Sequence, residues 1–323
     1  MNRMLFILSV SFGSIAVGYI IRRIIRSRTE RLDKTILSLS RRLKIISFFI
    51  LNPIATVSTF WGMTISDSRV FGIPAVGLAS VLIGMGGAMI VIRIMKLPPY
   101  RAGSVFTCGT FSNIITIGGL IAYTMFREPG YVMVQFFNLA AFPAYYLLGY
   151  PISANVGLGR KPVFKVSLAS FKENPYLILP ITATAVGLGL RYGGVARPEI
   201  FSHVVGFIVP CVAATLGIAI GLTLRFTSVR AYLREIGMIL IIRHLLVPGV
   251  MIPAAVLLGL GDVADGLPLK VTIILSTMPV AFSSLVPPAI YGFDLDLANS
   301  AWMVSTVLLA IIVPLLFLVF RFI

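Results

Sequence analysis

Apolar stretches of about twenty residues follow one another along the whole chain, with short polar or charged segments between them. A helix of that length and composition matches the hydrocarbon thickness of a bilayer. The 323-residue chain is 58% hydrophobic and 12% charged, with a mean hydropathy of +0.99, which is far more apolar than a soluble domain. The sequence therefore predicts an all-α membrane protein that crosses the bilayer many times.

About twenty apolar residues for each crossing divide the chain into ten predicted transmembrane helices. Their approximate ranges are 4–21, 43–61, 70–92, 102–126, 131–152, 174–190, 200–224, 235–260, 268–291 and 298–320.

Basic residues gather in alternate connections between these spans. Nine Lys or Arg lie in Arg22–Lys44, three in Arg93–Arg101, four in Arg160–Lys172 and three in Arg225–Arg234. The connections between these segments hold far fewer basic residues. Cytoplasmic loops carry the excess of Lys and Arg, so we expect these four segments inside the cell and both termini outside. This distribution also accounts for the net charge of +16 without a nucleic-acid partner.

The spans form two sets of five. Residues 1–158 make the first predicted repeat, 159–173 a cytoplasmic linker, and 174–323 the second repeat. An odd number of crossings inverts the second set relative to the first, as in the inverted repeats of many secondary transporters.

The fourth span of each set contains an interruption. Gly109–Gly119 reads GTFSNIITIGG, and Ser276–Gly292 reads STMPVAFSSLVPPAIYG. Gly, Ser, Thr, Asn and Pro unwind helices and free backbone polar groups, which cost several kcal/mol each in a bilayer unless they line a cavity or are buried in protein. Paired interruptions of this kind indicate the substrate site of a secondary transporter. The sequence thus predicts crossing, broken helices 4 and 9.

Polar side chains in these stretches are the candidate substrate-binding residues. They are Thr110, Ser112, Asn113, Ser283 and Ser284, with Pro279, Pro287 and Pro288 as candidate helix breaks or hinges. Half-helices made by such breaks point partially positive N-termini at the midplane, which suits an anionic group. The alternative is ordinary hydrogen bonding of Ser and Thr between membrane helices.

Two further positions are candidates. Asn52-Pro53 lies within the second span, where Pro removes a helical hydrogen bond and Asn can cap the freed groups. The pair is either a hinge or part of the pocket wall, or else a simple packing kink. Arg243 lies roughly 12 Å into the eighth span. It either snorkels to the cytoplasmic surface or faces the cavity as a cation for an anionic substrate.

No Asp or Glu falls clearly within a predicted span, which argues against a carboxylate proton relay or a carboxylate-built sodium site. The chain has no Walker A, H-E-x-x-H or G-x-S-x-G motif and no Cys/His cluster, so an ATPase or an intramembrane protease is not supported. We expect no enzyme activity, no cofactor and no metal.

Several segments together resemble the auxin efflux carrier family, over nearly the whole chain. LSLSRRLKIISFFILNPIATV is similar to the family's second span, ENPYLILPITATAVGLGL to the sixth, LGIAIGLTL to the end of the seventh, and RHLLVPGVMIP to the eighth. The most specific match is MPVAFSSLVPPAIYG followed by LANSAWMVSTVLLAIIVPLL. The resemblance implies ten helices with two crossing, unwound helices, and efflux of small organic anions such as carboxylates.

The chain also departs from the family pattern. Asn113 fits the family's asparagine in the fourth span, but the proline that follows it there is absent. Ser283 stands where many members have asparagine, and Ala289 replaces a frequently acidic position. These changes should leave the fold intact, whereas substrate and coupling can differ.

We therefore expect a secondary carrier that exports small organic anions by alternating access, with spans 1, 2, 6 and 7 as a scaffold. The alternatives are a cation-coupled symporter resembling the bile acid/sodium family and a membrane sensor that binds a ligand without transporting it. The expected partners are the organic anion and the lipid bilayer, with no nucleic acid and with a homodimer left open. We expect a multi-pass location in the cell membrane, the inner membrane of a bacterium.

Overall fold

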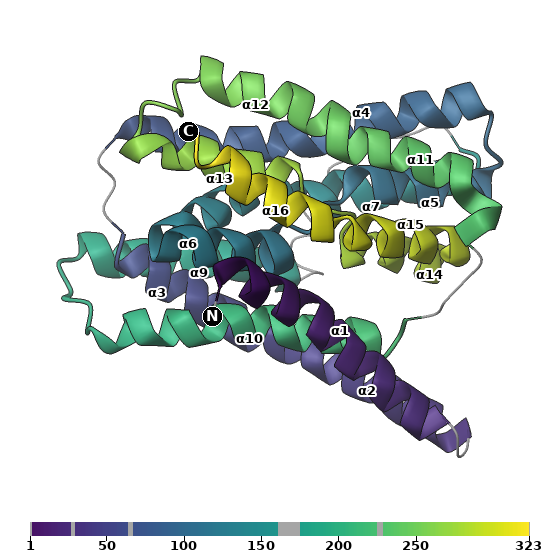
Figure 1. Ribbon diagram of the computed structural model, residues 1–323, viewed down its shortest axis with the longest axis horizontal. Helices are drawn as coiled ribbons and strands as arrows, with labels where there is room; N and C mark the ends of the chain where they lie inside the picture. The colour runs from purple at the N-terminus through teal and green to yellow at the C-terminus, as the bar shows by residue number, and fades with distance from the viewer. Residues whose placement is uncertain (1, 27–29, 64–66, 161–174, 225–228, 323) are drawn as a thin grey trace. The chain divides into compact units, whose positions relative to one another are not determined.

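The computed structural model describes residues 2–26, 30–63, 67–160, 175–224 and 229–322 (Figure 1). Within these residues the secondary structure is helical, apart from one isolated β-bridge. Seven helical stretches there are long and apolar enough to cross a membrane, and Ile178–Tyr192 is a shorter apolar helix. An all-helical, membrane-type protein is therefore confirmed. Helices overlap each of the ten predicted ranges, and one of the seven stretches, Ile114–Gly157, covers parts of two.

The chain packs into two compact units, each drawn from separate parts of the sequence. Unit 1 comprises Met1–Ile65, Ile115–Gln135 and Ile178–Leu224, and unit 2 comprises Ser66–Ile114, Phe136–Leu177 and Arg225–Ile323. This division follows spatial packing and does not test the predicted repeats 1–158 and 174–323. The linker 159–173 lies mainly outside the described residues.

Unit 1 contains the helices of the first, second, sixth and seventh predicted spans. These are α1 (Arg3–Arg26), α2 (Glu30–Ile46), α3 (Asn52–Trp61), α9 (Pro175–Tyr192) and α10 (Ile200–Gly221), together with the first part of α6 (Gly119–Ala144). In the basic segment 22–44, residues 22–26 are the end of α1 and residues 30–44 belong to α2.

Glycines bring α1 and α10 together in unit 1. A Cβ atom on Gly18 would meet the backbone carbonyl of Ile218, and one on Gly221 would meet the carbonyl of Ile15. Small residues allow this close backbone approach between membrane helices, where van der Waals packing drives association. Nearer the start of α10, Val205, Val209 and neighbouring apolar side chains form a buried cluster with Tyr123 and Tyr131.

Unit 2 contains the bridging residues of both interrupted spans, whereas residues 115–126 of the fourth predicted span belong to unit 1. Its helices are α4 (Ile73–Met95), α5 (Pro99–Thr110), α7 (Tyr150–Gly157), α11 (Leu233–Ile241), α12 (Val247–Leu257), α13 (Leu267–Ser276), α14 (Val286–Tyr291), α15 (Leu295–Val307) and α16 (Leu309–Val319), with the last part of α6. Arg127, with φ 58° and ψ −149°, divides α6 into the end of one predicted span and the start of the next.

Wide, π-helical turns come just before three prolines within longer helices. They are η1 (Ser47–Leu51) before Pro53, η4 (Tyr145–Gly149) before Pro151 and η6 (Ile242–Leu246) before Pro248. Proline lacks the N–H for an i→i−4 hydrogen bond and its ring clashes with that carbonyl. The extra residue in the preceding turn accommodates both effects, so each helix continues through its proline.

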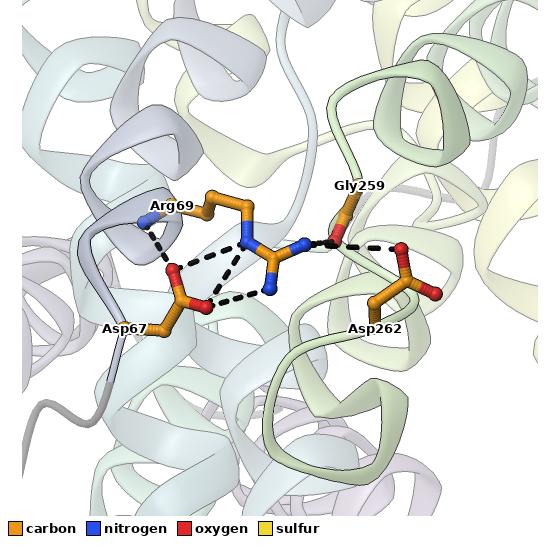
Figure 2. Close-up of polar contacts among 4 residues, drawn as sticks. All are labelled: Asp67, Arg69, Gly259 and Asp262. Atoms are coloured by element: carbon orange, nitrogen blue, oxygen red, sulfur yellow. Dashed lines mark hydrogen bonds and ion pairs between the residues drawn. The ribbon is translucent and has the colours of Figure 1, made fainter.

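An arginine ties together the elements at one end of unit 2 (Figure 2). The Arg69 guanidinium donates to the Asp67 carboxylate, with Nη2 2.7 Å from Oδ2, and Nη1 donates to the Gly259 carbonyl at 3.3 Å. Asp262 Oδ2 lies 3.8 Å from Nη1. Arg69 thereby links the start of α4 to the connection between α12 and α13. Its hydrogen bonds lower the pKa of the Asp67 carboxyl.

A second arginine, Arg101 in α5, joins this helix to η5 (Val229–Tyr232), to α11 and to the segment before α15. Arg101 lies 3.1 Å from Glu235 and 3.5 Å from Asp294, and its guanidinium stacks over the Tyr232 ring at 5.3 Å. Asp294 also accepts from the backbone N–H of Leu297 at 2.9 Å and so caps α15.

Candidate functional site

The two interrupted helices of unit 2 meet at their breaks. Helix α5 ends at Thr110 and α13 ends at Ser276. Beyond these ends Ser112 and Val280 form an antiparallel β-bridge. The N–H of Asn113 donates to the Pro279 carbonyl at 3.0 Å, and the N–H of Ala281 donates to the Phe111 carbonyl at 2.8 Å. Backbone groups that each break frees are therefore paired with those of the other break, as burial in an apolar protein requires.

Side chains from neighbouring helices accept hydrogen bonds from two further backbone N–H groups of the bridge. The N–H of Ser112 donates to the Tyr145 hydroxyl at 3.0 Å. The N–H of Val280 donates to Ser305 Oγ at 3.2 Å. The Tyr145 ring also packs against Phe111, with ring centroids 4.7 Å apart. One residue from η4 and one from α15 thus hold the two strands of the bridge in place.

Glycine leaves room for this arrangement at one position in particular. A Cβ atom on Gly149 would collide with the ring of Phe111. The aromatic side chain of the first break therefore fills the space that a larger residue in η4 would occupy. Gly149 was not singled out by sequence reasoning, because its role depends on a contact between distant segments.

Arg243 lies in η6 beside the second break. Its side chain is only 1% exposed, and Nη2 donates to the Met278 carbonyl at 3.3 Å. The Nε atom has no hydrogen-bond partner. The snorkelling interpretation is wrong, because the guanidinium is enclosed by protein and bonds to a carbonyl that the break has freed.

Six of the seven candidate binding residues belong to unit 2. They are Thr110, Ser112, Asn113, Ser283, Ser284 and Arg243. Ser112 and Asn113 are buried at the bridge, and Thr110 is buried with Oγ1 unpartnered. Ser283 is partly exposed in the turn that follows the bridge, and its carbonyl accepts from the Tyr150 hydroxyl at 3.3 Å.

The Ser284 hydroxyl lies deeper in the same turn. It donates to the Ala281 carbonyl at 2.6 Å and lies 3.8 Å from Cys108 Sγ. Ser112 Oγ likewise bonds to the Leu275 carbonyl at 3.5 Å. The hydroxyls of Ser112 and Ser284 therefore bond to backbone carbonyls within the unit.

The predicted helix breaks differ in their positions. Pro279 lies in the extended segment between α13 and the turn η8 (Phe282–Leu285), where its carbonyl takes part in the bridge. Pro287 and Pro288 lie in the first turn of α14, where a missing N–H costs little. Pro53 lies in the first turn of α3, directly after η1.

Asn52 belongs to unit 1 and has two buried partners there. Its Oδ1 accepts from the Tyr131 hydroxyl at 3.3 Å and from Gln135 Nε2 at 3.5 Å. Sequence reasoning did not single out Tyr131 and Gln135. Their four-residue spacing places them on one face of a helix, and an amide within an apolar span was a signal for a buried polar cluster.

No protein-family model matches the chain. A protein of Methanocaldococcus jannaschii described as an uncharacterized transporter is 23% identical to it over 239 residues, which cover 74% of this chain and 75% of that protein. The chain is thus similar to a transporter over most of its length.

Proposed function

We propose that this protein is a secondary membrane transporter, of the type of the auxin efflux carriers, that exports small organic anions by alternating access. Its ten spans would form two inverted five-helix repeats, with spans 4 and 9 broken and crossing. The observation that carries the proposal is the bridge between Ser112 and Val280, because two helices interrupted at membrane depth meet there. The apolar helices and the similarity to an archaeal transporter support the same function.

An organic anion is the substrate class that the local charge favours. Arg243 places a positive charge beside the breaks, and no carboxylate among the described residues forms an ion pair with it. Positive charge in a site of low dielectric attracts an anion over a longer range than it would in water. The polar groups proposed to contact the anion are those of the bridge and the turn after it, Asn113 and Ser283 first among them.

Export of such an anion needs no coupling ion. A membrane potential that is negative inside favours outward movement of one negative charge by about 2.3 kcal/mol per 100 mV, roughly a fiftyfold concentration ratio. Unit 1 contains the helices of spans 1, 2, 6 and 7, which we propose as the scaffold, and unit 2 contains both breaks.

The test begins with a thermal-shift screen of the purified protein against mono- and dicarboxylates, amino acids and aromatic acids. The stabilising acid is then loaded, radiolabelled, into proteoliposomes, and its efflux is followed with and without a valinomycin-imposed potassium potential. We expect efflux that requires the protein. Efflux should be faster when the imposed membrane potential is negative on the side that corresponds to the cytoplasm.

Two other outcomes would support the alternatives. Efflux that depends on a sodium or proton gradient would indicate a cation-coupled symporter. Binding in the thermal-shift screen without any protein-dependent flux would indicate a sensor. The Asn113→Ala variant in the same liposomes controls for leakage, since it alters the proposed site without changing the number of spans.

A further inference from the structure

Arg243 is a buried charge whose hydrogen-bond acceptor is part of the protein backbone. Isolated charges are very costly in an apolar interior unless they are paired or hydrogen-bonded. The described acidic groups that form ion pairs in unit 2 are bound to other arginines: Asp67 and Asp262 to Arg69, and Glu235 and Asp294 to Arg101. The acceptor that the structure gives to the Arg243 side chain is the Met278 carbonyl, within the second break.

The surroundings of Arg243 carry partial negative charge from helix ends. Helices α5 and α13 both end at the bridge, and the C-terminus of a helix is equivalent to about half a negative charge. The turn that carries Arg243 also touches the end of α5, because a Cβ atom on Gly109 would lie 3.3 Å from Ile242 Cδ1. The guanidinium is therefore bonded to an unwound carbonyl just after the C-terminus of α13, and the turn that carries it packs against the end of α5.

We propose that Arg243 is the resident cation of the paired breaks. In ion-coupled carriers with broken helices, unwound carbonyls and half-helix C-termini coordinate Na⁺ or bind a proton. Here a covalently attached guanidinium occupies that environment, so the bridge is held together without a dissociable cation. Arg243 is thus a positioning residue: its guanidinium bonds to the backbone of the second break, and its charge acts on the anion from a distance rather than by direct contact. The consequence for transport rests on the proposed function: if the protein exports an anion, that export should not require Na⁺.

The native cysteines offer a reporter of the bridge that needs no substrate. Cys108 is buried in α5, one turn before the bridge, and Cys211 lies in α10 of the other unit. In a Cys211→Ser background, alkylation by N-ethylmaleimide measures how often the region around Cys108 opens. Labelling is compared in sodium chloride and in choline chloride of equal ionic strength, below the melting temperature of each variant.

We expect the parent protein to be labelled slowly and at the same rate in both salts. Loss of a hydrogen bond to a charged group costs about 1.5–3 kcal/mol, so Arg243→Gln should be labelled roughly 10- to 100-fold faster in choline chloride. Arg243→Lys keeps the charge and should stay within about threefold of the parent, a difference below 1 kcal/mol. Arg93→Gln, an exposed neutralisation in α4 of the same unit, is the matched control and should leave the rate unchanged.

Three results would overturn the proposal. The first is slower labelling of the parent protein in sodium than in choline, which would reveal a bound, dissociable cation. The second is an Arg243→Gln rate equal to that of the parent. The third is an Arg243→Lys variant as labile as Arg243→Gln, or one that does not fold, because side-chain shape rather than charge would then be required. None of these measurements involves a substrate or a flux, so failure of the proposed transport function would be recognised separately.

Discussion

At the scale of single residues, the breaks persist because specific side chains complete their hydrogen bonds. Tyr145 accepts from the N–H of Ser112, and Ser305 accepts from that of Val280. A buried N–H without an acceptor carries its full desolvation cost of about 1–3 kcal/mol. The conformation of each break thus depends on residues far away in the sequence.

Tyr145→Phe removes one acceptor and keeps the aromatic ring that packs on Phe111. We expect the variant to be destabilised by about 1–3 kcal/mol, since the N–H of Ser112 remains buried without its partner. Thermal melts of the purified protein measure the change. Tyr192→Phe, at an exposed position in α9, is the control and should melt with the parent protein. Equal melting of Tyr145→Phe would show that the hydroxyl is not required.

Asn113 and Ser283 are the residues at which the proposed substrate contact can be tested. Asn113→Ala should weaken binding of the transported anion roughly ten- to a hundredfold, as expected for a lost hydrogen bond to a charged group. Ser283→Ala should cost less, because the shorter hydroxyl lies in a partly exposed turn. Affinity is read from thermal-shift titrations with the anion found in the screen. Unchanged affinity in both variants would exclude this site.

At the scale of elements, two kinds of contact hold the helices in register. Within unit 1, glycines let the backbones of α1 and α10 approach each other. Within unit 2, arginines join helix ends, as Arg69 does for α4 and the connection after α12 (Figure 2). Packing acts inside the membrane, where ion pairs are costly, and ion pairs act where the helices end.

Gly18→Ala should disrupt the packing of α1 on α10. The added methyl group would overlap the backbone carbonyl of Ile218, which cannot move away as a flexible side chain could. Overpacking of this kind costs about 1–3 kcal/mol, so the melting temperature should fall. Gly13→Ala in the same helix has open space around its Cβ and should not destabilise the protein. A Gly18→Ala variant as stable as Gly13→Ala would contradict the close approach.

The Asp67 carboxylate provides a pH-dependent contribution to stability. Because its pKa is lowered in the folded protein by hydrogen bonds from Arg69, its contribution is present above the ordinary carboxyl pKa of 3.8 and is lost as the pH falls through the lowered value. The parent protein should therefore melt above Asp67→Asn at neutral pH, and the two melting temperatures should converge in acid. The difference should be small and should shrink in high salt, because Arg69 is exposed. A difference that persists in acid would point to packing instead.

At the scale of the whole molecule, each compact unit combines segments from both halves of the sequence. The bridging residues of both interruptions lie in unit 2 and come from segments more than 160 positions apart, as in the hydrogen bond between Ser112 Oγ and Leu275. The predicted inverted repeats would account for such pairing, since corresponding spans of two related repeats would occupy equivalent places.

Both termini are predicted to be external, from the nineteen Lys or Arg in four alternate connections. In a variant with Cys108 and Cys211 replaced by serine, single cysteines at either end should react in intact cells with a membrane-impermeant maleimide. A cysteine at Ser38, in the basic segment 22–44, should react only after the membrane is permeabilised. A protected C-terminus would mean that the number of spans differs from ten by one.

Periodicity, composition and residue type were enough to predict much of this protein. Apolar length determined the all-helical membrane class, and the residues Gly, Ser, Asn and Pro marked both interruptions. These properties are local, because a bilayer imposes the same length and the same backbone hydrogen-bonding requirement on every span.

The tertiary structure alone decided which groups satisfy one another. The bridge between Ser112 and Val280, the hydroxyl of Tyr145 on Ser112 and the placement of Arg243 on Met278 all join distant segments. Sequence left two positions open for Arg243, the surface and the interior, because a long flexible side chain can reach either from one backbone position. Packing of η6 beside the second break decided between them, since it enclosed the guanidinium and offered it a carbonyl that no intact helix would have left free.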